Sequence, residues 1–116
     1  MTALIRPFAA LRPCPEHAAA VAAPPYDVLS SDEARSRAAG KPCSFLHISK
    51  AEIDLPPDVD HYAPEVYAKS AANLKQLIDD GILIRETSPC YYAYRLVMGS
   101  HTQTGLIASA SVAHYD

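Results

Sequence analysis

The chain has 116 residues, of which 49% are hydrophobic and 20% charged, so it suits one domain with a modest core and not a disordered chain. Its net charge is −3 and its arginines are scattered, which argues against a nucleic-acid partner. No apolar run approaches membrane-spanning length and no secretory segment opens the chain, so we expect a cytoplasmic protein without a membrane partner.

The N-terminal region is expected to hold an extended segment and one short helix. Leu4 to Leu11 mixes apolar residues with arginine and proline, which fits a short strand or an extended arm. The alanine-rich run from Pro15 to Ala22 favours a helix with proline in its first turn. Residues 23–28 contain two prolines, which push the residue before each of them out of the α region. We therefore expect this segment to be extended.

Further elements follow up to residue 62. Ser30 and Glu33 have the spacing of a capping box, which predicts a second helix that ends at Gly40. Residues 44–48 (Ser-Phe-Leu-His-Ile) are typical of a short strand, and residues 51–62 form an acidic, proline-containing loop.

The strongest helix prediction covers residues 64–80. Its apolar residues recur at helical spacing: Tyr67, Ala71, Leu74 and Ile78, with Leu77 widening the stripe. Gly81 should end this helix, and residues 82–84 should follow as a strand or a packed turn. We expect Tyr67, Leu74, Leu77 and Ile78 to be buried, with Lys69, Lys75 and Asp79 exposed.

Two strands should follow, at residues 91–98 and 103–112, joined by residues 99–102. These elements predict an α+β fold with a mixed sheet of about four or five strands and two or three helices. The chain ends directly after a predicted strand, whose edge would be left open. We therefore expect residues 1–116 to be a single domain or part of one, truncated from a longer chain, and to associate with a second copy as a homodimer.

Several runs together carry a family resemblance. They are Ile5 to Pro13, Ala23 to Ser30, Ser44 to Ile48, Tyr62 to Tyr67, Gly81 to Leu83, Tyr92 to Met98 and Gln103 to Gly105. In this order they resemble the start of a bacterial and archaeal family known as domain of unknown function 1015. Members of that family are several hundred residues long, so the resemblance implies a longer protein. A distant similarity to ParB-like and sulfiredoxin-like domains implies nucleotide chemistry only by analogy of fold.

The Pro-Pro-Tyr-Asp run at residues 24–27 is the most distinctive candidate site. Two prolines present Tyr26 beside Asp27, and a phenol next to a carboxylate suits a general base, a metal ligand or a ribose acceptor. The competing interpretation packs Tyr26 on the core and uses Asp27 to cap a turn. We take Asp27 as the candidate catalytic residue and expect it in or beside a cavity.

Arg6, Arg12 and Ser30 are the other candidate ligand-binding residues, with Tyr26. Arginine suits phosphate or carboxylate recognition, and the helix start at Ser30 offers free amides to a phosphate. Salt-bridged or solvated arginines and an ordinary helix cap explain the same residues more simply. His47 fits either a shielded acid or base or a core histidine bonded to the backbone.

No metal site is expected, because the histidines and cysteines lack zinc-type spacing. The leading functional hypothesis is the N-terminal part of a nucleotide- or phosphate-linked small-molecule enzyme. The sequence does not identify its cofactor, and a nucleotide is one candidate. The rival hypothesis is a non-catalytic interaction or regulatory module, linked to DNA by the ParB analogy. The sequence does not decide between them.

Overall fold

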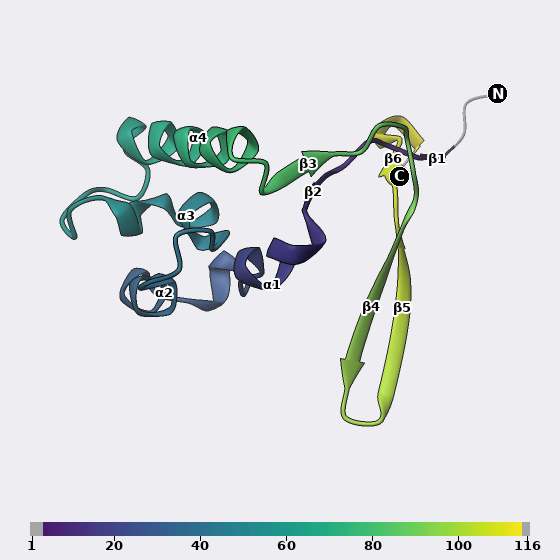
Figure 1. Cartoon of the computed structure of the whole chain (residues 1–116), viewed down its shortest axis with the longest axis horizontal. Helices are drawn as coiled ribbons and strands as arrows, with labels where there is room; N and C mark the ends of the chain where they lie inside the picture. Colours follow the sequence, from purple (N-terminus) through teal and green to yellow (C-terminus); the bar gives the residue numbers. More distant parts are fainter. Residues whose placement is uncertain (1–3, 115–116) are drawn as a thin grey trace. The chain divides into compact units, whose positions relative to one another are not determined.

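The computed structural model describes residues 4–114 (Figure 1). Its chain forms two compact units, which are described one at a time. We call residues 13–84 the helical unit. Of the described residues, 4–12 and 85–114 form the strand unit.

The helical unit contains four α-helices and three 3-10 turns. In chain order they are η1 (Pro15–His17), α1 (Ala18–Val21), η2 (Tyr26–Val28), α2 (Ser31–Ala38), α3 (Leu46–Ser49), η3 (Ala51–Asp54) and α4 (Pro64–Asp79). The helix predicted near residues 15–22 is confirmed as η1 followed by α1. Residues 23–28 were expected to be extended. They are extended only up to Pro25, because η2 begins at Tyr26. The loop predicted over residues 51–62 begins with η3.

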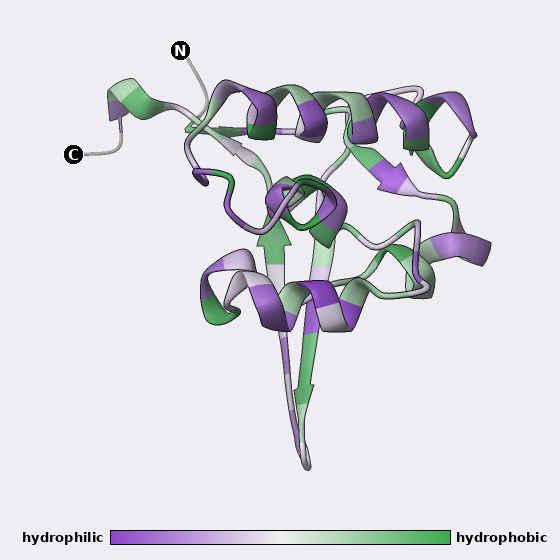
Figure 2. Cartoon of the chain, turned by 90° about the vertical axis from the view of Figure 1, so that its left-hand side faces the viewer, coloured by the Kyte–Doolittle hydropathy of each residue, from purple (hydrophilic) through white to green (hydrophobic). Residues whose placement is uncertain are grey.

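The core of the helical unit lies where α3 and η3 pack between α2 and α4 (Figure 1). Ala34 and Ala38 of α2 and Leu46 of α3 are its fully buried centre. Two of these are alanines, so α2 approaches α3 closely but buries little apolar area per residue. The helices around this core carry both hydrophilic and hydrophobic bands (Figure 2), as expected for elements with one covered face.

The prediction of a strand at residues 44–48 is wrong, because α3 begins within this segment, at Leu46. Its amides bond within the segment, as in the bonds from Ser49 to the Phe45 carbonyl and from Lys50 to the Leu46 carbonyl, both 2.9 Å. A short apolar run does not by itself distinguish a strand from a buried helical turn. Leu46 is 1% exposed between two helices, and no strand of the helical unit pairs with it.

The helix predicted at residues 64–80 is confirmed as α4, but its buried face differs from the predicted one. Val66 and Leu77 are buried, whereas Tyr67 is 60% and Ile78 43% exposed. Leu74 is half-buried. The inward-facing positions 66, 70, 73 and 77 each precede a predicted position by one residue. The buried face is therefore rotated by about 100° around the helix from the predicted one.

Two polar residues explain this rotation of α4. Ser70 and Asn73 lie between Val66 and Leu77 on the buried face, and they donate hydrogen bonds to the carbonyls of Ile48 (2.8 Å) and His47 (2.7 Å). The end of α3 leaves these carbonyls unpaired, so polar partners stabilise the contact. Of the charged residues expected outside, Lys75 and Asp79 are exposed and Lys69 is half-buried.

The predicted start of α2 and the predicted glycine ends of α2 and α4 are confirmed. Ser30 accepts a hydrogen bond from the Glu33 amide, while the Glu33 carboxylate accepts one from the Ser30 amide, both at 3.2 Å. Gly40 follows α2 with a positive φ of 70°. Gly81 follows α4 with φ 72°, and the Ile82 amide bonds the Leu77 carbonyl at 3.0 Å, which closes the helix as a Schellman motif.

Within residues 4–114, six short strands form three two-stranded antiparallel sheets. The strands are β1 (Ile5–Arg6), β2 (Leu11–Pro13), β3 (Leu83–Arg85), β4 (Tyr92–Met98), β5 (His101–Ile107) and β6 (Ser109–Ala110), paired as β1–β6, β2–β3 and β4–β5. The α+β class is therefore confirmed. The strands do not join into the one mixed sheet that was expected.

The β4–β5 hairpin is the longest pairing, with seven facing residue pairs from Tyr92–Ile107 to Met98–His101. Its turn is only Gly99 and Ser100, two residues shorter than predicted. Gly99 has φ 59°, as expected at the first central position of a type II′ turn, which matches the twist of the strands.

Tyr92 fixes the N-terminal segment within the strand unit. Its hydroxyl donates to the Phe8 carbonyl at 2.8 Å and accepts from the Ala10 amide at 2.9 Å. The Phe8 ring lies 5.2 Å from the Tyr92 ring, and Phe8 also forms a bridge with Cys90. The contacts of the Tyr92 side chain, more than a continuous strand, therefore order this segment.

Among residues 4–114, none of the helices has the length and apolar character needed to cross a membrane.

Candidate functional site

The predicted site residues of the Pro-Pro-Tyr-Asp run lie at η2 of the helical unit. Tyr26 is 60% exposed and lines a cavity that is described below. Asp27 was expected in or beside a cavity. It is exposed and does not line the cavity that includes its neighbour Tyr26. The Ser30 hydroxyl is occupied by the helix cap, which matches the simpler interpretation of this residue.

Arg6 and Arg12 lie in the strand unit. Arg12 pairs with Glu86 at 3.2 Å, and its guanidinium lies 5.2 Å from the centre of the Tyr92 ring. Arg6 is exposed on β1. The salt-bridged interpretation therefore describes Arg12, and the two arginines belong to a different unit from Tyr26 and Asp27.

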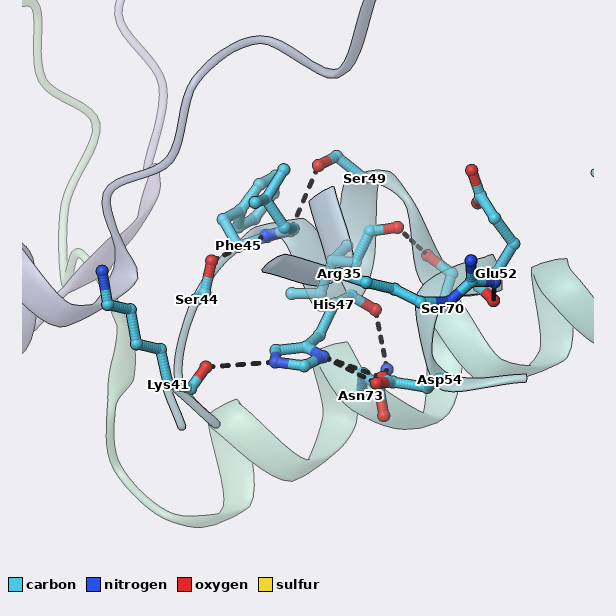
Figure 3. Close-up of polar contacts among 12 residues, drawn as sticks. Arg35, Lys41, Ser44, Phe45, His47, Ser49, Glu52, Asp54, Ser70 and Asn73 are labelled. Atoms are coloured by element: carbon cyan, nitrogen blue, oxygen red, sulfur yellow. Dashed lines mark hydrogen bonds and ion pairs between the residues drawn. The ribbon is translucent and has the colours of Figure 1, made fainter. Parts of the chain in front are cut away.

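His47 lies at the centre of a hydrogen-bonded cluster (Figure 3). Its Nδ1 is 2.9 Å from both carboxylate oxygens of Asp54, and its Nε2 donates to the Lys41 carbonyl at 3.0 Å. Asn73 of α4 donates to the same Asp54 carboxylate at 3.0 Å. The cluster therefore connects α3, η3 and α4.

These contacts give His47 a structural role. Both ring nitrogens face oxygen acceptors, Nδ1 the carboxylate of Asp54 and Nε2 the carbonyl of Lys41. Neither nitrogen is left for a substrate. The expectation of a histidine bonded to the backbone is confirmed in its hydrogen bond to Lys41, although His47 lies on a helix and not on a strand.

A cavity of about 410 Å³ on the helical unit is the candidate functional site. We call it the tyrosine cavity. Its lining comprises Tyr26, Ile48, Ser49, Lys50, Ala51, Glu52, His61, Tyr62, Val66, Tyr67 and Ser70. These residues come from η2, the α3–η3 segment, the loop before α4, and α4 itself. Its size lies in the usual range of small-molecule sites, which are mainly apolar with a few polar groups.

The polar centre of the tyrosine cavity is the ion pair of Lys50 and Glu52. Their Nζ and Oε1 atoms are 3.3 Å apart, and the side chains are only 12% and 7% exposed. Burial raises the pKa of the Glu52 carboxyl, but hydrogen bonds from its own amide, Lys50 and Ser31 outweigh burial, so the pKa is lowered. Glu52 is therefore ionised at neutral pH, and its charge is balanced by Lys50.

Ser31 extends this pair toward the surface. Its Oγ donates to Glu52 Oε1 at 3.2 Å and lies 3.3 Å from His61 Nε2. A continuous set of polar contacts thus runs from Lys50 through Glu52 and Ser31 to the exposed His61 ring.

The sequence does not predict most of this site. The Ser31–Glu52 and Ser31–His61 contacts join residues that are 21 and 30 positions apart, and no spacing rule links residues that far apart. Glu52 lies in the segment predicted as an acidic loop, and Ser31 directly follows the capping residue Ser30. Tyr26 is the predicted site residue that the cavity includes.

Metal and thiol chemistry depend on where the His, Cys, Asp and Glu side chains lie. Among residues 4–114, no group of three or more His, Cys, Asp or Glu side chains is placed to hold a metal ion. Cys14, Cys43 and Cys90 are free thiols. A hydrogen bond from the Cys14 thiol to Glu16, with burial and the charge of that carboxylate, raises the thiol pKa and so lowers its nucleophilic fraction.

Comparison with known proteins gives one family. The model of a family described as a protein of unknown function (DUF1015) matches residues 5–116. No curated protein and no solved structure matches the chain.

Proposed function

The chain belongs to the DUF1015 family, and from this premise we propose that it supplies a ligand-binding part of a nucleotide- or phosphate-linked small-molecule enzyme. The observation that carries the proposal is the tyrosine cavity, where three tyrosines surround a charge-balanced polar centre. Tyr26, Tyr62 and Tyr67 would contact a planar base, and Lys50 and His61 are the polar side chains beside it.

Tyrosine rings suit such a ligand for two physical reasons. A base stacks on an aromatic ring with about 1–3 kcal/mol per base. The tyrosines are also 60%, 81% and 60% exposed, so part of this apolar surface is free to be covered by a ligand. A ligand that covers it gains hydrophobic stabilisation without displacing a packed core.

The charges near the cavity are compatible with an anionic group. Lys50 offsets Glu52, so the buried carboxylate does not leave a net negative charge that would repel phosphate. Asp27, next to Tyr26 in the chain, is the proposed catalytic carboxylate at the margin of this site. Arg6, Arg12 and Ser30 stay predictions from the sequence.

Titration calorimetry with ATP, ADP, adenosine and inorganic phosphate tests this proposal. Replacing Tyr67→Ala should weaken nucleotide binding about tenfold or more, because it removes one stacking surface. Tyr94→Ala is the matched control, since Tyr94 is similarly exposed at 54% but lies on the hairpin. No binding of any of these ligands, or equal affinities in the two variants, would contradict the proposal.

A non-catalytic interaction or regulatory module is the second candidate, and the β4–β5 hairpin favours it. Leu96 and Met98 on one face and Val97 and Leu106 on the other are all more than half exposed. Apolar side chains on both faces of a ribbon are typical of a surface that another molecule covers. The DNA-associated form of this candidate gains no support from a net charge of −3.

A further inference from the structure

The hydrogen bonds of Ser31 have a defined direction. A serine hydroxyl has a single proton to donate, whereas an ionised carboxylate only accepts. Ser31 Oγ lies 3.2 Å from Glu52 Oε1 and 3.3 Å from His61 Nε2. The proton of Ser31 therefore points at Glu52, and a lone pair of the same oxygen faces the histidine ring.

This direction decides which nitrogen of His61 carries its proton. Nε2 faces an oxygen lone pair, so Nε2 is the donor of that contact. A neutral imidazole carries one proton, and its other nitrogen is then a bare acceptor. Within residues 4–114 no hydrogen bond reaches His61 Nδ1, and the exposed His61 side chain lines the tyrosine cavity.

We infer that Ser31 is a positioning residue: together with Glu52 it holds neutral His61 in the Nε2–H tautomer, so that Nδ1 is an open hydrogen-bond acceptor at the tyrosine cavity. The ligand that this acceptor selects carries a hydroxyl or amino donor close to its planar ring. This part of the inference rests on the proposed function, in which the ribose hydroxyls of a nucleoside supply that donor.

The direction of the Ser31 hydrogen bond argues against a nucleophilic role for Ser31. A serine nucleophile needs its proton aimed at the base that removes it. Ser31 directs its proton at Glu52, whose lowered pKa makes it a weak base. The Ser31–His61 contact is therefore not a nucleophile–base pair, although its two atoms are close enough for one.

Nitrogen-15 NMR of the histidine rings tests the tautomer without any ligand. The spectra are followed with pH up to their alkaline plateau, where the ring is neutral, and His61→Gln identifies the His61 signals. In the wild type, Nε2 should give the protonated signal and Nδ1 the unprotonated one. Ser31→Ala should shift the two signals toward those of the same chain in denaturant, and Ser31→Thr, which keeps the hydroxyl, should restore them.

Ser30→Ala is the matched control, because it removes a neighbouring hydroxyl that caps α2 without touching His61. It should lower stability and leave the His61 tautomer unchanged. A wild-type ring with its proton on Nδ1 would overturn the inference. So would a His61 tautomer that is the same in the wild type and in a folded Ser31→Ala variant.

A second measurement tests the ligand class separately. The protein should bind adenosine about tenfold more tightly than 2′,3′-dideoxyadenosine, the loss expected for one hydrogen bond. His61→Phe should remove this preference while keeping a ring at the cavity. Equal affinities in the wild type would overturn the ligand class. Absence of binding by both nucleosides would also overturn the ligand class. The NMR result would still decide the tautomer, and calorimetry with ATP, ADP and phosphate would still decide the proposed function.

Discussion

Glu52 illustrates at the scale of a residue how burial and charge are reconciled in this protein. Only 6% of the residue is exposed, and a buried carboxylate without partners would be strongly unfavourable. Lys50 and Ser31 both bond its Oε1 atom. Removing one partner of such a pair is costly, because the other charge stays buried.

Glu52→Gln should therefore destabilise the chain by about 1.5–3 kcal/mol near neutral pH, the contribution of hydrogen bonds to a charged group. The pKa of Glu52 is lowered from an ordinary value of 4.5. Its stabilising contribution is thus present above 4.5 and lost as the pH falls through the lowered pKa. Denaturant unfolding of both proteins from about pH 7 to about pH 3 should show the difference shrinking with acid.

Asp58→Asn is the control for Glu52→Gln, since Asp58 is an exposed carboxylate of the loop before α4. Its substitution should change stability by less than about 0.5 kcal/mol. A Glu52→Gln variant as stable as the wild type at neutral pH would show that the ion pair contributes no net stability.

At the scale of an element, α2 depends on its first turn. The helix has only eight residues, and short helices are marginal without tertiary contacts and caps. Ser30→Ala should cost about 1 kcal/mol by removing the cap. Ser36→Ala, at an exposed position within the same helix, should be close to neutral. Equal unfolding free energies for the two variants would contradict this.

The capping box also predicts a pH dependence. The amide and hydroxyl of Ser30 bond the Glu33 carboxylate and lower its pKa from the ordinary 4.5. The contribution of Glu33 to stability is thus present above 4.5 and lost at lower pH. In Ser30→Ala, the unfolding free energy should depend less on pH over this range than in the wild type.

The long helix α4 offers two adjacent residues that report which of its faces is buried. Leu77 is 6% exposed and Ile78 43% exposed. Leu77→Ala should cost about 2–5 kcal/mol, the range for a core leucine. Ile78→Ala should cost clearly less, because solvent already reaches that side chain. Chemical denaturation of the two variants is the measurement, and a larger loss at Ile78 would mean that the helix buries the face first expected from the sequence.

For the whole molecule, the exposed hairpin carries the prediction of self-association. The outer edges of β4 and β5 are unpaired among the described strands, and open strand edges pair readily with another chain. We expect two copies to associate through residues 91–98 or 105–112 as a two-fold dimer, the commonest closed assembly. Sedimentation over a wide concentration range measures this.

Val97→Lys provides the sharper test of the same prediction. Val97 is 66% exposed near the turn of the hairpin, where it faces Thr102, so a lysine there should not disturb the fold of the chain. It should weaken association, because a charge replaces an apolar contact. A protein that is monomeric at every concentration would contradict the prediction, and so would association that Val97→Lys leaves unchanged.

The sequence by itself determined the elements whose signals are local. The capping box from Ser30 to Glu33, the glycine end of α4 at Gly81 and the hairpin around Gly99 each depend on a few neighbouring residues. These rules concern backbone dihedral angles and hydrogen bonds within a turn, so they hold in any tertiary context. The α+β class followed from them.

Only the tertiary structure decided the fate of residues 44–48, the buried face of α4 and the composition of the tyrosine cavity. Residues 44–48 have the composition of a strand, but without a neighbouring strand in their unit they became a buried helical turn. The rotation of α4 depends on carbonyls presented by α3 to Ser70 and Asn73. Packing and hydrogen bonds between segments distant in the chain override local pattern, and a site such as Ser31 with Glu52 and His61 exists only once those segments have met.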